Sequence, residues 1–280
     1  MNYFLFSRKQ AIEITHMSGQ NEKPRMAVHK FSSCDGCQLA ILNMGSALAQ
    51  LSARVDIVHF AEMGPIATDA TVDIALVEGS VATQADIDRI KAIRKKSKLL
   101  VTIGACATSG GVQALRNINN DLRWQTEIYP HPDALDSLPQ SYPISEHVSV
   151  DHQLWGCPVN SRQVLDLLNS LLFGVRPRDE KEILCLECKR KQNVCTLVSQ
   201  GSCCMGPVTR SGCGALCPGI ERDCYGCYGA AEGVNVKSLA NRFTQLISEK
   251  DLAASQREIQ RAVENRFRFI HRHEIDKSIP

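Results

Sequence analysis

Apolar residues in the first two-thirds of the chain form short runs separated by longer stretches with helical spacing. The runs are nearly continuous rather than alternating, which is typical of parallel strands that are buried on both faces. Five strands are predicted, the last with the weakest pattern: Arg25–Phe31, Arg54–Phe60, Val72–Glu78, Lys98–Gly104 and His147–Asp151.

Helical periodicity fills the gaps between these runs. One predicted helix carries four leucines on a shared face: Leu39, Leu42, Leu48 and Leu51. A second begins at Thr83, whose hydroxyl and the Asp86 carboxylate three residues later resemble a capping box. A third follows Asn160 and stops at Gly174. The alternation of strand and helix predicts a doubly wound α/β domain over residues 24–175.

The rest of the chain has a different character. Residues 1–23 predict a flexible extension without a twin-arginine pair or an apolar export segment, so we expect a cytoplasmic protein. Residues 176–233 are rich in Gly, Pro and Cys and lack periodicity, so metal is the expected source of their stability. Residues 234–280 return to helical stripes that predict core or subunit interface.

Composition narrows the class of protein. A net charge of +2 over 280 residues gives no basic footprint for nucleic acid, and no apolar run is long enough to insert into a membrane. The chain holds 13 cysteines, an odd number in a long chain with no export signal, which favours metal ligands over disulfides.

Four cysteines of the α/β part follow predicted strands. Cys34 and Cys37 come after the first strand, Cys106 after the fourth and Cys157 after the fifth. Because the carboxyl ends of parallel strands share one crevice, we expect these thiols to converge there. Four thiolates suit a 4Fe–4S cluster. Taken singly, Cys106 and Cys157 could equally be inert core cysteines, and the Cys34–Cys37 pair also fits a redox or zinc motif.

The remaining nine cysteines crowd into 43 residues. A zinc ribbon would need four ligands, whereas this segment offers nine. With one cysteine set aside, 12 remain for three clusters of four, and Cys203, next to Cys204, is the predicted spare. The pairing into clusters stays open, since such ligands interleave in ferredoxins. The eight predicted ligands here are Cys185, Cys188, Cys195, Cys204, Cys213, Cys217, Cys224 and Cys227.

Several motifs together resemble one family, the small subunits of nickel–iron hydrogenases. The α/β motifs are Ser33-Cys34-Asp35-Gly36-Cys37-Gln38-Leu39, Val77-Glu78-Gly79-Ser80-Val81, Gly104-Ala105-Cys106-Ala107 and Gly156-Cys157-Pro158. The segment Cys185–Gly229 is similar to the delta-type subunits of cytoplasmic bidirectional enzymes, the sulfhydrogenase and methyl-viologen-reducing class. The resemblance implies a flavodoxin-like domain, a small iron–sulfur domain and C-terminal helices.

The resemblance also implies a function. Cys34, Cys37, Cys106 and Cys157 would hold the proximal cluster, nearest a nickel–iron centre whose ligands belong to a separate large subunit. The implied reaction is H2 ⇌ 2 H+ + 2 e−, with electrons passing through three 4Fe–4S clusters. A partner subunit bearing FAD and serving NAD(P)+ or a related acceptor would receive them.

Alternatives remain at this stage. The chain could be an iron–sulfur electron-transfer subunit of another complex, related to complex I or to heterodisulfide reduction. Against complex I, that family's motif has adjacent cysteines where this chain has Cys34-x2-Cys37. A zinc-stapled interaction protein is the third hypothesis. Glu78 is a candidate group beside the proximal cluster, or else a solvated or amide-bonded carboxylate, and Lys189–Lys191 is a solvated face or a guide for a redox partner.

Overall fold

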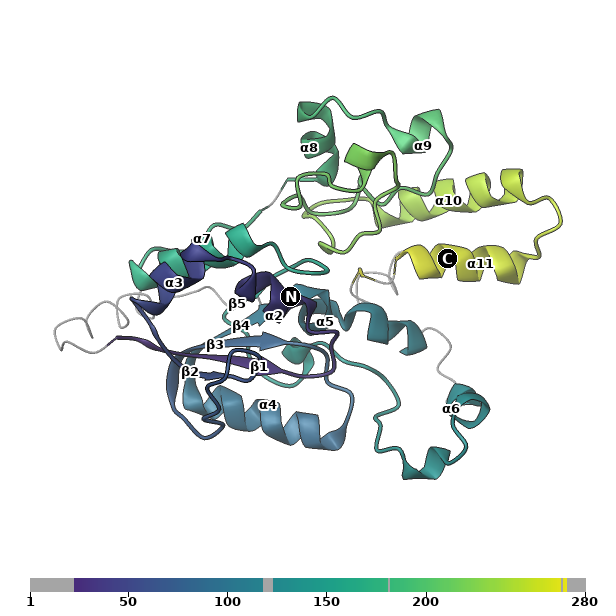
Figure 1. Cartoon of the computed structure of the whole chain (residues 1–280). Helices are drawn as coiled ribbons and strands as arrows, with labels where there is room; N and C mark the ends of the chain where they lie inside the picture. Colours follow the sequence, from purple (N-terminus) through teal and green to yellow (C-terminus); the bar gives the residue numbers. More distant parts are fainter. Residues whose placement is uncertain (1–22, 118–122, 181, 268, 271–280) are drawn as a thin grey trace. The chain divides into compact units, whose positions relative to one another are not determined.

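The computed structural model describes residues 23–117, 123–180, 182–267 and 269–270. The chain divides into two compact units, Met1–Arg178 and Asp179–Pro280, which we call the α/β unit and the cysteine-rich unit (Figure 1). The predicted extension over residues 1–23 lies outside the described residues except for Lys23.

The α/β unit is built on a five-stranded parallel sheet in the order β2-β1-β3-β4-β5. This 2-1-3-4-5 order is the flavodoxin-like one, so the predicted fold class is confirmed. β1 and β3 are neighbours, and the chain winds outward from them in both directions. The strands are β1 (Arg25–Lys30), β2 (Asp56–Phe60), β3 (Val72–Glu78), β4 (Ser97–Ile103) and β5 (His152–Leu154).

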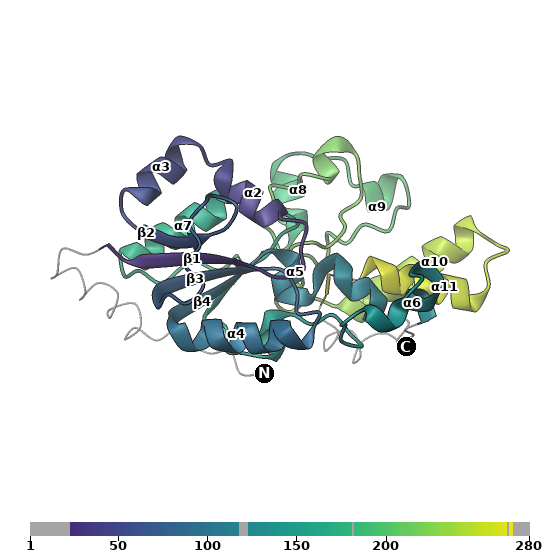
Figure 2. The ribbon, with the colours of Figure 1, turned by 60° about the horizontal axis from the view of Figure 1, so that its bottom comes forward.

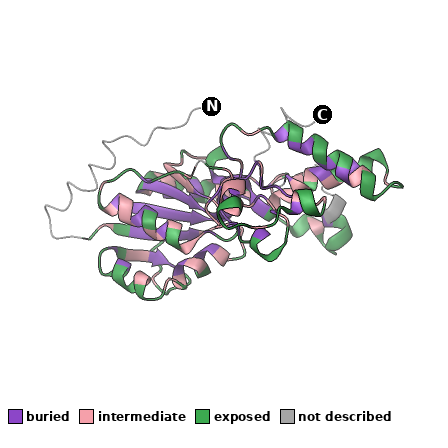
Figure 3. Ribbon diagram, turned by 90° about the horizontal axis from the view of Figure 1, so that it is seen from above, coloured by how far each residue is buried: buried purple, intermediate pink, exposed green. Residues whose placement is uncertain are grey.

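Helices cover both faces of this sheet (Figure 2). One face packs against α2 (Gly36–Leu42), α3 (Ser46–Ser52) and α7 (Ser161–Leu172) through a core that includes Met26, Ile74 and Leu168. The other packs against α4 (Gln84–Lys96) through Ala75, Ile90 and Leu100. The central strands β1, β3 and β4 are accordingly buried along most of their length (Figure 3).

Helix ends follow their capping residues. Thr83 and Asp86 form the predicted capping box of α4, and the Asn160 side chain accepts a hydrogen bond from the Arg162 amide at the start of α7. Gly174, just beyond α7, has a φ of 65°. The C-terminal turn of α4 gathers the basic residues that favour that end of a helix.

Two local predictions are wrong. The last strand lies at His152–Leu154 and not at His147–Asp151, because the residues that pair with the end of β4 begin at His152, which faces Val101. The four leucines after Cys37 do not share one helix, because Gly45, at a φ of 58°, separates α2 from α3. Leu39 is consequently half exposed rather than part of the core.

Short elements complete the α/β unit after β4. They are α5 (Gly104–Ser109), η2 (Gly111–Asn117), α6 (Arg123–Ile128), η3 (Pro132–Ala134) and η4 (Ile144–Glu146). None of them has an apolar pattern long enough to be predicted from the sequence.

The cysteine-rich unit contains short elements followed by two longer helices. They are α8 (Leu184–Arg190), α9 (Thr196–Ser199), η5 (Pro218–Ile220), α10 (Val236–Lys250) and α11 (Gln256–Arg266). Leu239, Phe243 and Val263 of the two long helices pack into one core with Cys204 and Cys224. Across the described ranges, no helix combines the length and apolarity needed to cross a membrane.

Candidate metal-cluster sites

The four cysteines of the α/β unit lie at the carboxyl end of the sheet. Cys34 and Cys37 follow β1, Cys106 lies in α5 directly after β4, and Cys157 follows β5. Cys37 interacts electrostatically with Cys106 and Cys157, and Cys106 with Cys157 and Cys34, so all four thiols share one neighbourhood. The tertiary structure therefore brings together the set that the sequence placed at strand ends.

Glycines make room for the sulfurs at this edge. A Cβ on Gly104 would lie 2.3 Å from Cys37 Sγ, and Gly104 has a φ of 84°. A Cβ on Gly36 would lie 3.3 Å from Cys34 Sγ and 3.5 Å from Pro158 Cβ. At Gly104 the backbone thus approaches a thiol more closely than any other residue would allow, while at Gly36 the fit is only tight.

The loop that carries Cys34 and Cys37 is held by two carboxylates. Asp35, at a φ of 65°, accepts hydrogen bonds from Lys30 Nζ at 2.6 Å and from Gln38 Nε2 at 3.4 Å. Glu78, at the end of β3, accepts the Cys37 N–H on Oε1 at 3.0 Å. Hydrogen bonds to Asp35 and from Cys37 therefore both hold the Cys-x2-Cys turn.

Glu78 is an amide-bonded carboxylate and not a solvated one. It is 2% exposed, and its second oxygen, Oε2, is buried without a hydrogen-bond partner in the described part of the chain. Burial raises the pKa of Glu78, which the Cys37 hydrogen bond partly offsets. This charge lies within electrostatic reach of Cys37 and Cys106.

Hydrogen-bond donors also point at these sulfurs. Cys37 Sγ accepts from the Val159 amide, and Cys106 interacts with the side chain of Gln113, which also donates to the Ser32 carbonyl at 3.0 Å. Sequence reasoning missed Gln113, because it lies in a short 3-10 helix without an apolar pattern or a motif. Donors of this kind tune the potential of a thiolate-bound centre.

The eight predicted ligands of the cysteine-rich unit are linked to one another through shared neighbours, and Cys188 interacts with Cys213 as well as with Cys204 and Cys195. Cys185 interacts with Cys204, Cys188 and Cys195, and a Cβ on Gly206 would lie 3.4 Å from Cys185 Sγ and 3.5 Å from Cys204 Sγ. Cys217 interacts with Cys213, and Cys224 with Cys227. Cys204 also accepts the Cys224 amide at 3.3 Å and interacts with Cys188 and Cys217, so it is a common neighbour of these cysteines.

Cys203 has a different environment from these eight. Burial raises the pKa of its thiol, while the charges acting on it come from Arg266, Lys250 and Asp223 rather than from other cysteines. It packs in the core beside α10 and α11. Its surroundings are those of a structural thiol.

Two further side chains of the cysteine-rich unit support the turns. Glu187 in α8 accepts the amides of Gly212 and Ala215 at 2.9 and 3.1 Å, which holds the loop carrying Cys213. Asn193 Nδ2 lies 3.8 Å from Cys188 Sγ. Neither was singled out from the sequence, where a Glu or Asn between cysteines carries no distinguishing signal.

The donor set fits iron–sulfur clusters. All 13 cysteines are free thiols. Burial, reinforced by neighbouring cysteines, raises the pKa of Cys106 and of Cys185 to about 11, so bare thiolates are disfavoured and positive charge from bound metal would stabilise them. Within the described ranges, no three Cys, His, Asp or Glu side chains converge as a single-ion site.

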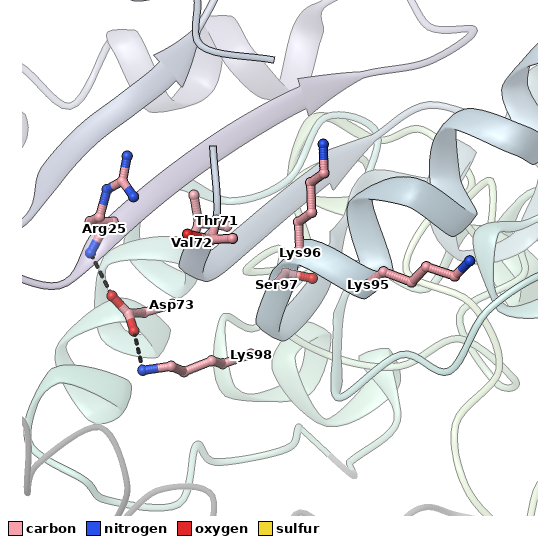
Figure 4. Close-up of a pocket in the computed structure, with 8 residues that line it drawn as sticks. All are labelled: Arg25, Thr71, Val72, Asp73, Lys95, Lys96, Ser97 and Lys98. Carbon is pink, nitrogen blue, oxygen red and sulfur yellow. Dashed lines mark hydrogen bonds and ion pairs between the residues drawn. The ribbon is translucent and has the colours of Figure 1, made fainter. Parts of the chain in front are cut away.

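One surface pocket lies at the opposite, amino-terminal edge of the sheet (Figure 4). It is lined by the starts of β1, β3 and β4 and the end of α4. Asp73 accepts the Arg25 amide and pairs with Lys98 Nζ, both at 2.8 Å. Lys95 and Lys96 belong to the basic last turn of α4, so the lining has a structural explanation and is remote from the cysteines.

Comparison with known proteins gives a consistent picture. The family model for the NADH ubiquinone oxidoreductase 20 kDa subunit matches residues 34–171. Sulfhydrogenase 2 subunit delta of Pyrococcus furiosus is 30% identical over 85% of this chain and 99% of its own length. A subunit of the F420-non-reducing hydrogenase vhu of Methanococcus voltae is 29% identical over 79% of this chain and 88% of its own.

A solved structure agrees with these relatives. A chain from the crystal structure of an NAD+-reducing [NiFe]-hydrogenase in the H2-reduced state is 29% identical, with a TM-score of 0.52. The match covers 56% of this chain and 96% of that chain.

Proposed function

Because the chain belongs to the family of nickel–iron hydrogenase small subunits, we propose that it carries electrons between two partners through three 4Fe–4S clusters. One partner is the large subunit that holds the nickel–iron site. The other is a flavin-bearing subunit linked to NAD(P)+ or a related acceptor. The reaction served is H2 ⇌ 2 H+ + 2 e−.

The observation that carries this proposal is the convergence of four thiols from three strand ends on a backbone that has no room for a Cβ at Gly104. Cys34, Cys37, Cys106 and Cys157 would hold the proximal cluster. The eight ligands of the cysteine-rich unit would hold the other two. Each bound cluster supplies a one-electron centre, and the chemistry at hydrogen belongs to the partner subunit.

The chain's own residues position these thiols. Glu78 fixes the Cys37 backbone, Val159 and Gln113 donate to sulfurs, and burial of Cys37 excludes water from that thiol. Glu78→Gln keeps a group that can accept the Cys37 amide but removes a negative charge, so we expect slower turnover with all clusters retained. Unchanged turnover would show that the negative charge of Glu78 does not contribute to electron transfer.

Cytoplasmic residence forms part of the proposal. Thirteen free thiols suit a reducing compartment, where they remain available to metal.

A second candidate rests on the family model, whose description is that of a complex I subunit. The chain would then conduct electrons in an assembly without nickel. The relatives matched over most of the chain carry hydrogenase names, which favours the first proposal.

Anaerobic elemental analysis of the complex that co-purifies with this chain separates these functions. Nickel together with at least about twelve iron atoms per chain, four for each cluster, is the expected result. Iron without nickel would favour the complex I-related function. Zinc with little iron would contradict both.

A further inference from the structure

In the cysteine-rich unit, one predicted cluster ligand stands out by its exposure. Cys195 is exposed, whereas the other eight cysteines of the unit are buried or intermediate. It lies between α8 and α9 (Figure 1). Large apolar side chains flank both Cys195 and Cys217 and are 65–83% exposed: Val194, Val198, Leu216 and Ile220. An exposed apolar surface beside predicted redox ligands is typical of a site where another protein binds.

The segments that carry these side chains lie side by side. Lys191 Nζ is 3.2 Å from the Cβ position of Gly214, and Asn193 Nδ2 is 3.9 Å from that of Gly219. The loop before Cys195 therefore runs along the loop around Cys217. We call the surface they form the exit face, defined by Lys191, Val194, Cys195, Leu216, Ile220 and Arg222.

The charge at the exit face is positive. Lys191 and Arg222 are exposed there with the carboxylate of Glu221, and Lys189 is exposed in the adjoining last turn of α8. The nearby acids are engaged elsewhere. Glu187 is bound to backbone amides, and Glu182 pairs with Arg190 at 2.6 Å. An apolar centre with a basic rim favours a partner whose own rim is acidic.

We propose that the exit face docks the electron-accepting, flavin-bearing partner through an acidic surface on that partner. The inference rests on the proposed function and names where the partner binds. One electron at a time leaves the chain here and reduces a one-electron centre of the partner. No bond forms or breaks and no proton moves in this step.

The test is the subunit and cofactor content of the tagged, anaerobically purified holo-complex. Leu216→Glu places a charge in the apolar centre, and Lys191→Glu reverses a charge of the rim. We expect flavin per chain to fall about tenfold for Leu216→Glu and severalfold for Lys191→Glu, with nickel and iron per chain unchanged. Raising the salt concentration should release flavin from the wild type as well, because the rim attraction is screened.

Matched controls carry the same changes away from the exit face. Leu252→Glu alters the 93% exposed leucine between α10 and α11, and Lys237→Glu reverses a charge on α10. Both should keep wild-type flavin. If Leu216→Glu loses iron, its loss of flavin cannot be assigned to docking alone. The test of the exit face then rests on Lys191→Glu.

Four results are decisive. Flavin retained at wild-type levels in Lys191→Glu overturns the docking proposal, as does loss of the nickel subunit in place of flavin. A wild-type complex with nickel but without flavin overturns it too. Absence of nickel from every complex would instead contradict the proposed hydrogenase function. The comparison of flavin content between the variants and the wild type would still test whether the partner docks at the exit face.

Discussion

The two units of this chain hold their cysteines in different ways. In the α/β unit mostly aliphatic side chains pack both faces of the sheet, and of the four predicted ligands only Cys37 belongs to that core. In the cysteine-rich unit Cys203, Cys204 and Cys224 are themselves part of the core. Metal is thus an addition to a fold that packs without it in the first unit, and a component of the packing in the second.

Removal of iron should produce the largest difference in stability between the two units. We expect a chelator under reducing conditions to expose the amides of residues 184–230 while β1, β3 and β4 stay protected. Predicted cluster ligands are part of the core that residues 184–230 share with α10 and α11, whereas the core of the sheet is mostly aliphatic. Hydrogen exchange on the full chain measures both regions at once. Equal loss of protection in the two units would contradict the comparison.

Adding a methyl group at Gly104 tests whether the backbone must approach the Cys37 sulfur closely for the proximal cluster to bind. Gly104→Ala would place a Cβ 2.3 Å from Cys37 Sγ, so we expect loss of about four of about twelve iron atoms, those of the proximal cluster. Gly45→Ala is the matched control. Its φ is also positive, which disfavours alanine, but a Cβ there meets nothing within 4 Å. Iron content by colorimetry distinguishes the two, and retention of all iron in Gly104→Ala would refute the close approach.

Acid should weaken the α/β unit through a buried histidine pair. His29 and His59 stack with ring centroids 4.6 Å apart, and burial, with the His59 and Arg89 charges, lowers the pKa of His29 to about 3. The unfolded chain binds a proton below about pH 6.5 that the folded chain does not. Stability present above pH 6.5 is therefore lost as the pH falls, by up to about 1.4 kcal/mol per pH unit.

Denaturant midpoints of the α/β unit, followed by hydrogen exchange at pH 7.5 and 5.5, measure this loss. His29→Phe keeps a ring for stacking but cannot bind a proton, so its midpoint should change less between the two values. Substitution of the exposed His131 by Gln is the control and should follow the wild type. An identical pH dependence in His29→Phe would exclude His29 as the cause.

The smallest expected effect is that of Cys203→Ser. Because no cysteine charge acts on Cys203, we expect the variant to keep all the iron of the wild type, at a modest cost in stability from a buried hydroxyl. Cys204→Ser, one residue away, should lose a cluster. Iron counts and the cluster spectra of the two variants settle which of the adjacent thiols is the ligand.

Much of the α/β fold was accessible from the sequence, because the strands that carry it are buried on both faces and read as continuous apolar runs. The α4 capping box and the Asn160 cap were also recognisable, since they depend on residues three or fewer positions apart. The strand predicted at His147–Asp151 failed because a three-residue edge strand is defined by its partner, β4, and not by its own pattern.

The sequence by itself determined the class of this protein, since strand-end cysteines and a run of Gly, Pro and Cys point to metal whatever the details of packing. Only the tertiary structure decided which groups surround each sulfur. The Cys37 amide meets Glu78 from 41 residues away, Gln113 reaches Cys106, and Lys191 lies along the Gly214 loop. Such contacts depend on where the sheet and the loops bring distant residues together, and local periodicity carries no record of them.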